Sequence, residues 1–367
     1  MVTRPLAQLR ERDPGSDEPA RAIPRLRAPL SWGMLVALLA VVVLANLGLG
    51  AFEVGVDRIV AILLGKVGID IGVQYSSAEE AVVWAIRLPR LLLAALVGAG
   101  LGVSGAALQG VFRNPLADPS LIGVSSGAAF AVALAVLLGL TSAAVFIQPL
   151  VAFVGGLIFT LGIYAFSRSA GRVQMATMLL VGIAVNALLA SAISFILSLS
   201  DDGALRDIVY WILGSLGGSV WEYAITAGPL ILIAIAVLIR QTGALNLLTL
   251  GDAEARHLGL KVERSQFIIV SAAALATGAG VAVAGVVGFV GLVAPHLVRL
   301  VVGPDHRRLI PGSALSGAIL VLGADLGART IVSPAELPLG VVTAVIGGPV
   351  FLYLIHRARR SLASAGW

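Results

Sequence analysis

The stretch Leu245-Asn-Leu-Leu-Thr-Leu-Gly-Asp-Ala-Glu-Ala-Arg-His-Leu-Gly-Leu260 is a polar interruption between two long apolar blocks of the sequence. Gly251 and Gly259 favour helix ends, so the stretch predicts two short helices rather than one long helix. Neither helix would reach the roughly 20 residues that a membrane span requires. The charged side chains, which are Asp252, Glu254, Arg256 and Lys261, favour an aqueous location. We expect a surface element made for contact with a partner, and a plain solvated loop is the alternative.

The composition places the chain among multi-span helical membrane proteins that form one bundle. Hydrophobic residues make up 58% of the sequence and charged residues only 12%. The absence of cysteine excludes disulfides, thiol nucleophiles and thiolate metal sites. The formal net charge is +5, but the basic residues fall beside apolar segments. The positive-inside bias explains them, so we expect no nucleic-acid partner.

Ten apolar segments predict an all-α polytopic fold with about ten transmembrane helices. They are residues 32–50, 91–111, 121–140, 145–166, 178–200, 221–239, 267–283, 286–302, 311–326 and 339–355. Because the count is even, both termini fall on one side of the membrane. Most arginine and lysine residues outside the spans lie on that side, which predicts cytoplasmic termini. Residues 1–30, which are rich in arginine and proline, predict a disordered basic cytoplasmic tail.

Two local patterns refine this prediction near the second span. Gly98, Gly102, Ala106 and Gly110 recur every fourth residue, which favours close approach of another helix backbone. Pro89 is expected to fix the start of this span. Before it, the charged external segment 51–85 predicts a short helix near residues 56–64.

The predicted spans contain almost no ionisable groups. Only Asp325 and Arg329 lie at the end of a span, whereas ion-coupled carriers usually keep a buried carboxylate or histidine for coupling. The chain also lacks a phosphate loop, because Gly65-Lys66 is followed by valine. The four histidines are scattered and predict no metal site. The sequence therefore favours a transport pathway energised by a separate ATPase over an ion-coupled secondary carrier or an intramembrane enzyme.

Six motifs, one of them within the opening stretch, occur in order along the chain. They are Arg87-Leu-Pro-Arg90, Gly105-Ala-Ala-Leu-Gln-Gly-Val-Phe-Arg-Asn-Pro-Leu-Ala-Asp-Pro119, Leu121-Ile-Gly-Val-Ser-Ser-Gly127, Leu250-Gly-Asp-Ala-Glu-Ala-Arg-His-Leu-Gly259, Gly288-Phe-Val-Gly-Leu-Val-Ala-Pro-His-Leu-Val-Arg299 and Glu336-Leu-Pro-Leu-Gly340. Together they resemble the permease subunit of the ABC importers for ferric siderophores, haem and cobalamin. The resemblance covers about residues 32–360 and implies a transmembrane permease domain at 31–360 with the BtuC-like type II importer fold.

The resemblance implies that the opening stretch is a coupling loop, residues 245–264, which docks into a cytoplasmic ATPase. The implied docking residues are Leu250, Gly251, Asp252, Glu254, Ala255, Arg256, His257, Leu258 and Gly259. Two ATPase subunits would hold ATP and magnesium, whereas this chain would bind no cofactor and have no catalytic residue.

The resemblance also implies that Arg87, Arg90 and Arg329 bind glutamates of an external substrate-binding protein. A planar guanidinium suits this role because it offers a fork of donors to a carboxylate. Read from the residues alone, Arg87 and Arg90 could equally be snorkelling side chains at the membrane interface.

Two further segments are expected at the cytoplasmic side. Gln174, Met175, Ala176 and Thr177 resemble a segment that narrows the inner mouth of the pathway, although Met175 and Ala176 depart from its small polar pattern. Asn114, Pro115, Asp118 and Pro119 predict a tight turn between the second and third spans. In that turn Asp118 would cap the next helix and Pro119 would take its first position, and a role in the transport pathway is the alternative to a purely architectural one. At the other side, residues 204–211 resemble a short external helix.

The resulting expectation is a permease of the bacterial cytoplasmic membrane that forms a dimer around a central pathway. The dimer would consist of two copies or include a related chain. A ferric siderophore is the expected cargo, with haem and cobalamin as alternatives that the sequence does not distinguish.

Overall fold

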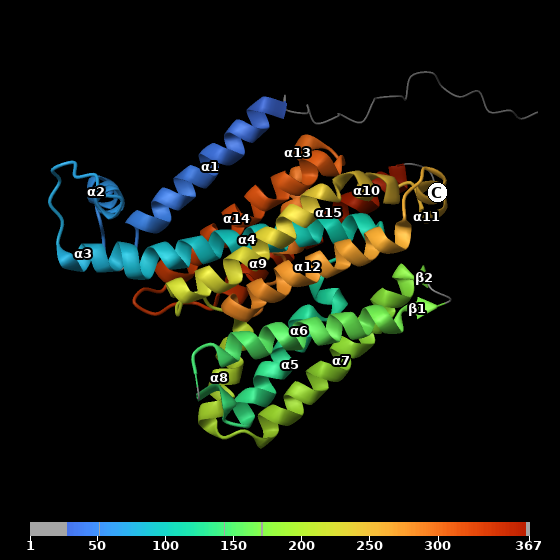
Figure 1. The fold of residues 1–367 in the computed structure, drawn as a ribbon, viewed down its shortest axis with the longest axis horizontal. Helices are drawn as coiled ribbons and strands as arrows, with labels where there is room; N and C mark the ends of the chain where they lie inside the picture. Colours follow the sequence, from blue (N-terminus) through green and yellow to red (C-terminus); the bar gives the residue numbers. More distant parts are fainter. Residues whose placement is uncertain (1–27, 51, 143, 170–171, 365–367) are drawn as a thin grey trace, which may run out of the picture.

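The computed structural model describes residues 28–50, 52–142, 144–169 and 172–364, and most of them lie in helices (Figure 1). The predicted tail lies outside the described residues, apart from 28–30, which belong to the first helix. The described part of the chain contains ten apolar helices, one for each predicted segment. They are α1 (Ala28–Gly48), α4 (Leu88–Phe112), α5 (Val124–Leu137), α6 (Ile147–Phe166), α7 (Met175–Leu199), α9 (Trp221–Arg240), α12 (Val262–Ala284), α13 (Val290–Val302), α14 (His306–Thr330) and α15 (Leu339–Ser364). Within that part, six helices are long and apolar enough to cross a membrane, as expected of an all-α membrane protein. The other four have shorter apolar stretches, which are Trp32–Gly48, Val124–Leu137, Val290–Val302 and Leu339–Tyr353.

Shorter elements lie between these helices and at the two ends of the bundle. They are α2 (Val56–Lys66), α3 (Ser77–Ala81), the π-helical turn η1 (Val82–Arg87), the 3-10 turns η2 (Pro119–Ile122) and η3 (Leu140–Ser142), the strand pair β1 (Arg168–Ser169) and β2 (Arg172–Val173), α8 (Asp202–Leu213), α10 (Thr242–Leu248) and α11 (Asp252–His257). Figure 1 shows α2 and α3 at one end of the bundle and α10, α11 and the strand pair at the other. We call these the α2–α3 end and the α10–α11 end.

Helix α4 is the centre of the bundle, packed against α14, α12, α13 and α9 (Figure 1). Its predicted small-residue face lies against the backbone of α14. A Cβ atom on Gly98 would lie 2.3 Å from the carbonyl oxygen of Gly317, and one on Gly102 would lie 2.2 Å from that of Ser313. The close approach predicted from the glycine spacing is therefore confirmed, and α4 and α14 form an interlocked pair. Helices α5, α6 and α7 form a second group that packs on this core through α12.

Pro89 is the second residue of α4 and so lies at the start of the second span as predicted, but it does not begin the helical segment. Helix α4 continues α3 and η1 without a break, so the helical segment runs from Ser77 to Phe112 and Pro89 lies inside it. Proline lacks an N–H donor, and its ring collides with the carbonyl four residues earlier, which here belongs to Ala85. That carbonyl lies in the wider π-helical turn η1, where the altered hydrogen bonding accommodates the proline.

Candidate functional site

The stretch that opened the sequence analysis, residues 245–260, forms the predicted pair of short helices, α10 and α11. Gly251, which precedes α11, has a φ of 112°, and Gly259, which follows it, has a φ of 86°. These left-handed values are ones that glycine adopts readily and other residues rarely adopt. The two glycines therefore set the angles at which α11 leaves α10 and enters α12.

One side of the pair is fixed in the bundle by apolar contacts. Leu245 and Leu248 of α10 and Ala255 of α11 are completely buried. They belong to a cluster that also contains Val111 of α4 and Leu309 of α14. Burying a leucine side chain of this kind contributes about 1.5–3 kcal/mol. The helix pair is thus a fixed part of the bundle and not a loosely attached loop.

Polar contacts fix α11 as well. Asp252 lies 3.4 Å from the guanidinium of Arg113, at the end of α4, and accepts a hydrogen bond of 3.3 Å from Gln266 of α12. The Arg256 guanidinium donates to the Glu263 carboxylate at 2.8 Å. Arg256 is therefore held in a partly exposed local ion pair.

The opposite side of the pair is open. The side chains of Leu250 and Leu258 are 58% and 60% exposed, and Glu254, His257 and Gly259 beside them are exposed too. Together these five residues make a surface that we call the α10–α11 surface. Two exposed leucines between polar groups on a fixed helix pair are typical of a surface that a protein partner covers.

A link that the sequence analysis missed ties α10 to the start of α14. The Asn246 amide donates to Asp305 Oδ1 at 2.7 Å, and its oxygen accepts from the backbone N–H of His306 at 2.9 Å. Asp305 also caps α14 by accepting from the Arg307 N–H, and the bond from Asn246 holds the pKa of Asp305 below its usual value. The only signal in the sequence was an aspartate placed to cap the ninth span. Its partner lies 59 residues earlier, so the local pattern could not identify it.

At the α2–α3 end the structure brings Arg87 and Arg329 together at the end of α1. Arg87 donates to the carbonyl oxygens of Leu47, Gly48 and Phe52. Arg329 donates to those of Asn46 at 2.6 Å and Leu49 at 2.9 Å, and to the Asn46 side chain at 3.1 Å. Helix C-termini leave their last carbonyls without intrahelical partners and attract positive charge. The two arginines therefore cap the C-terminus of α1.

Arg90 is held by two carboxylates that the sequence analysis did not assign to it. Its Nε donates to Asp325 at 3.0 and 3.1 Å, and its Nη1 and Nη2 each donate to one oxygen of Glu336 at 2.9 Å. Arg90 and Asp325 are buried, whereas the Glu336 side chain is 42% exposed. The bonds from Arg90 lower the pKa of Glu336. In this structure the three predicted docking arginines thus bind groups of their own chain.

The predicted turn after α4 is present with its cap. Asp118 accepts from the Ser120 N–H at 2.8 Å, and Pro119 is the first residue of η2. Asn114 accepts from the Leu116 N–H at 3.0 Å, and Pro115 is exposed within the turn. Burial raises the pKa of Asp118. This geometry accounts for the segment as architecture.

The predicted gate segment starts α7 at the α10–α11 end. Gln174 is the residue before the helix, and its side chain accepts a hydrogen bond of 3.0 Å from the Thr177 hydroxyl. Ala176 is exposed, whereas Met175 packs against two apolar clusters. Its role as a gate stays a prediction.

Helix α7 is the least covered of the six long spans in the described part of the chain. Only 17% of its most apolar window is buried. One exposed stripe carries Ala187, Ser191, Ser194 and Ser198, and each serine hydroxyl donates to a carbonyl of its own helix. Because each serine hydroxyl already donates to the backbone, the stripe presents small side chains whose hydrogen-bond donors are occupied.

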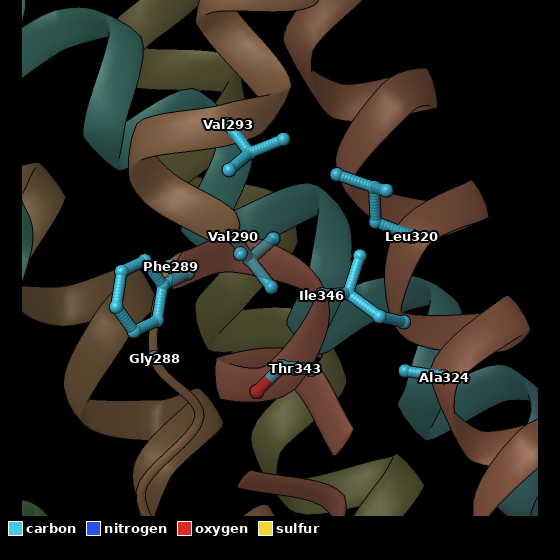
Figure 2. A pocket seen from close by; sticks show the side chains of 9 residues that line it. Gly288, Phe289, Val290, Val293, Leu320, Ala324, Thr343 and Ile346 are labelled. Atoms are coloured by element: carbon cyan, nitrogen blue, oxygen red, sulfur yellow. The ribbon is translucent and has the colours of Figure 1, made fainter. Parts of the chain in front are cut away.

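An apolar pocket lies where α13, α14 and α15 meet (Figure 2). Val290, Leu320 and Ile346 converge on it, and the Thr343 hydroxyl is the one polar side-chain group among the residues that line it. The pocket presents no ionisable group for catalysis. Among all the described residues, we find no group of three or more His, Asp or Glu side chains placed to hold a metal ion.

Comparison with known proteins gives one consistent result. A model of the FecCD transport family matches residues 38–357. The chain is 42% identical to the hemin transport system permease protein HmuU of Yersinia pestis, over 91% of this chain and 98% of that protein. It is 41% identical to the vitamin B12 import system permease protein BtuC of Vibrio cholerae, over 81% and 89% of the two chains. A solved inward-facing structure assigned to the metal-chelate type of ABC transporters matches with a TM-score of 0.77 and 32% identity, covering 90% of this chain and 99% of that one.

Proposed function

This chain belongs to the FecCD transport family and is an ABC importer permease, and from that premise we propose that it carries a large metal chelate across the bacterial cytoplasmic membrane. A ferric siderophore is the cargo that we propose first. Haem is the second candidate, because the chain matches a hemin permease over 98% of that protein's length. Cobalamin stands third, on the similarity to the vitamin B12 permease.

The α10–α11 surface is the observation on which the mechanism rests, since it combines a fixed base with an exposed, partly apolar face. In the proposed mechanism two separate ATPase subunits dock on this surface in a dimer of permeases. ATP and magnesium are bound there, and this chain performs no covalent chemistry. Closure of the ATPases pushes on α10 and α11, and the buried side of the pair passes that displacement to α4 and α14.

The exposed stripe of α7 supports a pathway between two permease copies. A bulky chelate needs a wide passage, and the small side chains at Ala187, Ser191, Ser194 and Ser198 leave room along this face. No charged filter is required, because an external substrate-binding protein selects the cargo. In this arrangement the α10–α11 end is cytoplasmic and the α2–α3 end faces that binding protein.

The docking of the ATPases can be tested by native mass spectrometry of the chain purified from its own host with its associated subunits. We expect two permease copies with two ATPases. Arg256→Glu, which reverses a charge beside the surface, and Leu258→Asp, which changes an exposed side chain, should both lose the ATPases while the permease dimer stays intact.

The matched control for this experiment is Arg168→Glu, which makes the same charge change at an exposed residue of β1 at the same end of the bundle. We expect this variant to retain both ATPases. If Arg256→Glu and Leu258→Asp also retain them at the wild-type ratio, the ATPases dock elsewhere. Uptake of a ferric siderophore, haem and cobalamin into liposomes by the intact complex then distinguishes the three cargoes.

A further inference from the structure

The motif Glu336-Leu-Pro-Leu-Gly340 has no part in the mechanism above, yet its first residue holds Arg90. We propose that Glu336 is an internal substitute for a partner's carboxylate. It occupies Arg90 in the free permease and leaves when an acidic protein docks at the α2–α3 end. This inference rests on the proposed function only in that a binding protein presents carboxylates to this end.

The geometry makes Glu336 the exchangeable ligand of Arg90. The two terminal nitrogens of Arg90 form a bidentate pair with Glu336, whereas Asp325 binds its Nε and also lies 3.0 Å from its Nη2. Asp325 is 2% exposed within the α4–α14 contact, so a soluble partner has no access to it. Glu336 lies on the α14–α15 loop and is 42% exposed. A partner's carboxylate can approach the same two nitrogens from the side that Glu336 now covers.

The backbone around Glu336 permits such an exchange without movement of a helix. The Leu337 N–H donates to the Ala328 carbonyl at 2.8 Å, and the Leu339 N–H donates to the Gly214 carbonyl at 2.8 Å. These bonds fix the chain just after Glu336. On the other side, Ile331 and Val332 are 69% and 48% exposed. The carboxylate can therefore turn outward together with the exposed residues that precede it, while α14 and α15 keep their positions.

The other two arginines are unsuited to the same exchange. Arg87 and Arg329 bind the carbonyls at the end of α1, and a partner that took them would leave those carbonyls without donors. Buried carbonyls without partners are costly, at about 1–3 kcal/mol each. The Arg90–Glu336 pair carries no such cost, because one carboxylate replaces another. The structure thus assigns docking to Arg90 and capping of α1 to its neighbours.

The first test measures binding of a hexaglutamate peptide to the purified full chain in nanodiscs. Removing the competing carboxylate with Glu336→Gln should tighten binding about tenfold, the change expected for loss of a competing interaction of about 1.4 kcal/mol. Glu222→Gln is the matched control, since Glu222 is an exposed glutamate at the start of α9 near the same end, and it should bind like wild type. Arg90→Gln should abolish binding, and hexaglutamine should not bind.

The second test follows the loop itself and uses the absence of cysteine from the chain. A spin label on Ala335→Cys sits beside Glu336 at an exposed position. Hexaglutamate should increase the mobility of this label, as should Glu336→Gln without peptide, whereas Glu222→Gln should not. Equal peptide affinity of Glu336→Gln and wild type, absence of peptide binding to both, or an unchanged label would each overturn the inference. Neither test involves ATPases or chelate, so failure of the proposed transport function would appear separately, in the native mass spectrometry and uptake experiments.

Discussion

Replacing Gly98 by alanine tests whether α4 and α14 behave as one unit. The added Cβ would lie 2.3 Å from the Gly317 carbonyl oxygen and 2.9 Å from the Ala318 Cα. An ordinary contact between such atoms is about 3.5 Å, so the helices must separate by roughly 1 Å. Helix tilting cannot relieve the clash, because Gly102 approaches Ser313 equally closely one turn along α4. We expect a loss of about 1–3 kcal/mol in the free energy of unfolding, the usual cost of overpacking a close contact.

The assay is the thermal denaturation midpoint of the detergent-solubilised chain, measured by fluorescence size-exclusion after heating. At about 2 °C per kcal/mol, a slope suited to long chains, Gly98→Ala should lower the midpoint by about 2–6 °C. Gly323→Ala is the matched control, because it makes the same change inside α14 where no atom lies within 4 Å of the new Cβ. It should leave the midpoint unchanged or raise it, since alanine favours helix over glycine. Equal midpoints for the two variants would refute the interlocked arrangement.

Three further outcomes follow from the contacts at the two ends. Arg329→Gln should remove one cap from the C-terminus of α1, so amide hydrogen exchange at residues 45–50 should become faster while exchange in α4 is unchanged. Slow exchange at residues 45–50 in this variant would contradict the capping role. Asn246→Ala should break the link from α10 to α14 and lower the free energy of unfolding by about 1–3 kcal/mol. Chelate-stimulated ATP hydrolysis should fall several-fold while the ATPases stay in the complex. Hydrolysis at the wild-type rate would show that the link does not transmit the displacement. Arg90 lowers the pKa of Glu336, so the Arg90–Glu336 ion pair should persist as the pH falls through about 4.3, the ordinary pKa of glutamate. The stability that this ion pair gives the loop should be lost only at lower pH. A spin label on Ala335→Cys that becomes mobile above pH 5 would contradict this.

Local patterns were sufficient for the fold. Apolar runs located the ten apolar helices of the described residues, because a helix in lipid satisfies its backbone hydrogen bonds within itself. Gly251 located the break between the two short helices and Gly259 the end of the second, since left-handed backbone values favour glycine. Pro89 located the start of α4, but the continuation of the helix back to Ser77 was not predicted because the π-helical turn before Pro89 has no distinctive signal in the sequence.

The partners of the site residues could not be predicted in the same way. Arg90 binds residues 235 and 246 positions away, and Arg329 reaches the end of a helix about 280 positions earlier. Nothing local in the sequence encodes such pairs, so the three arginines were grouped by resemblance and expected to be available. In the structure Arg87 and Arg329 bind carbonyls at the end of α1, and Arg90 binds two carboxylates, of which Asp325 also lies 3.8 Å from Arg329. The role of the three arginines in docking stays a prediction.

The α4–α14 pair connects the two candidate surfaces of the molecule. Helix α4 carries Arg90 at one end and is followed at the other by Arg113, which contacts α11. Helix α14 begins at His306, bound by α10, and carries Asp325 near its far end. Each helix has 25 residues and spans about 37 Å. In the proposed mechanism, both helices together carry a displacement of α10 and α11 to the groups that hold Arg90, because their backbones interlock at glycines. In that mechanism a change in the ligands of Arg90 also alters the energy of displacing α10 and α11, since coupling between two sites is reciprocal.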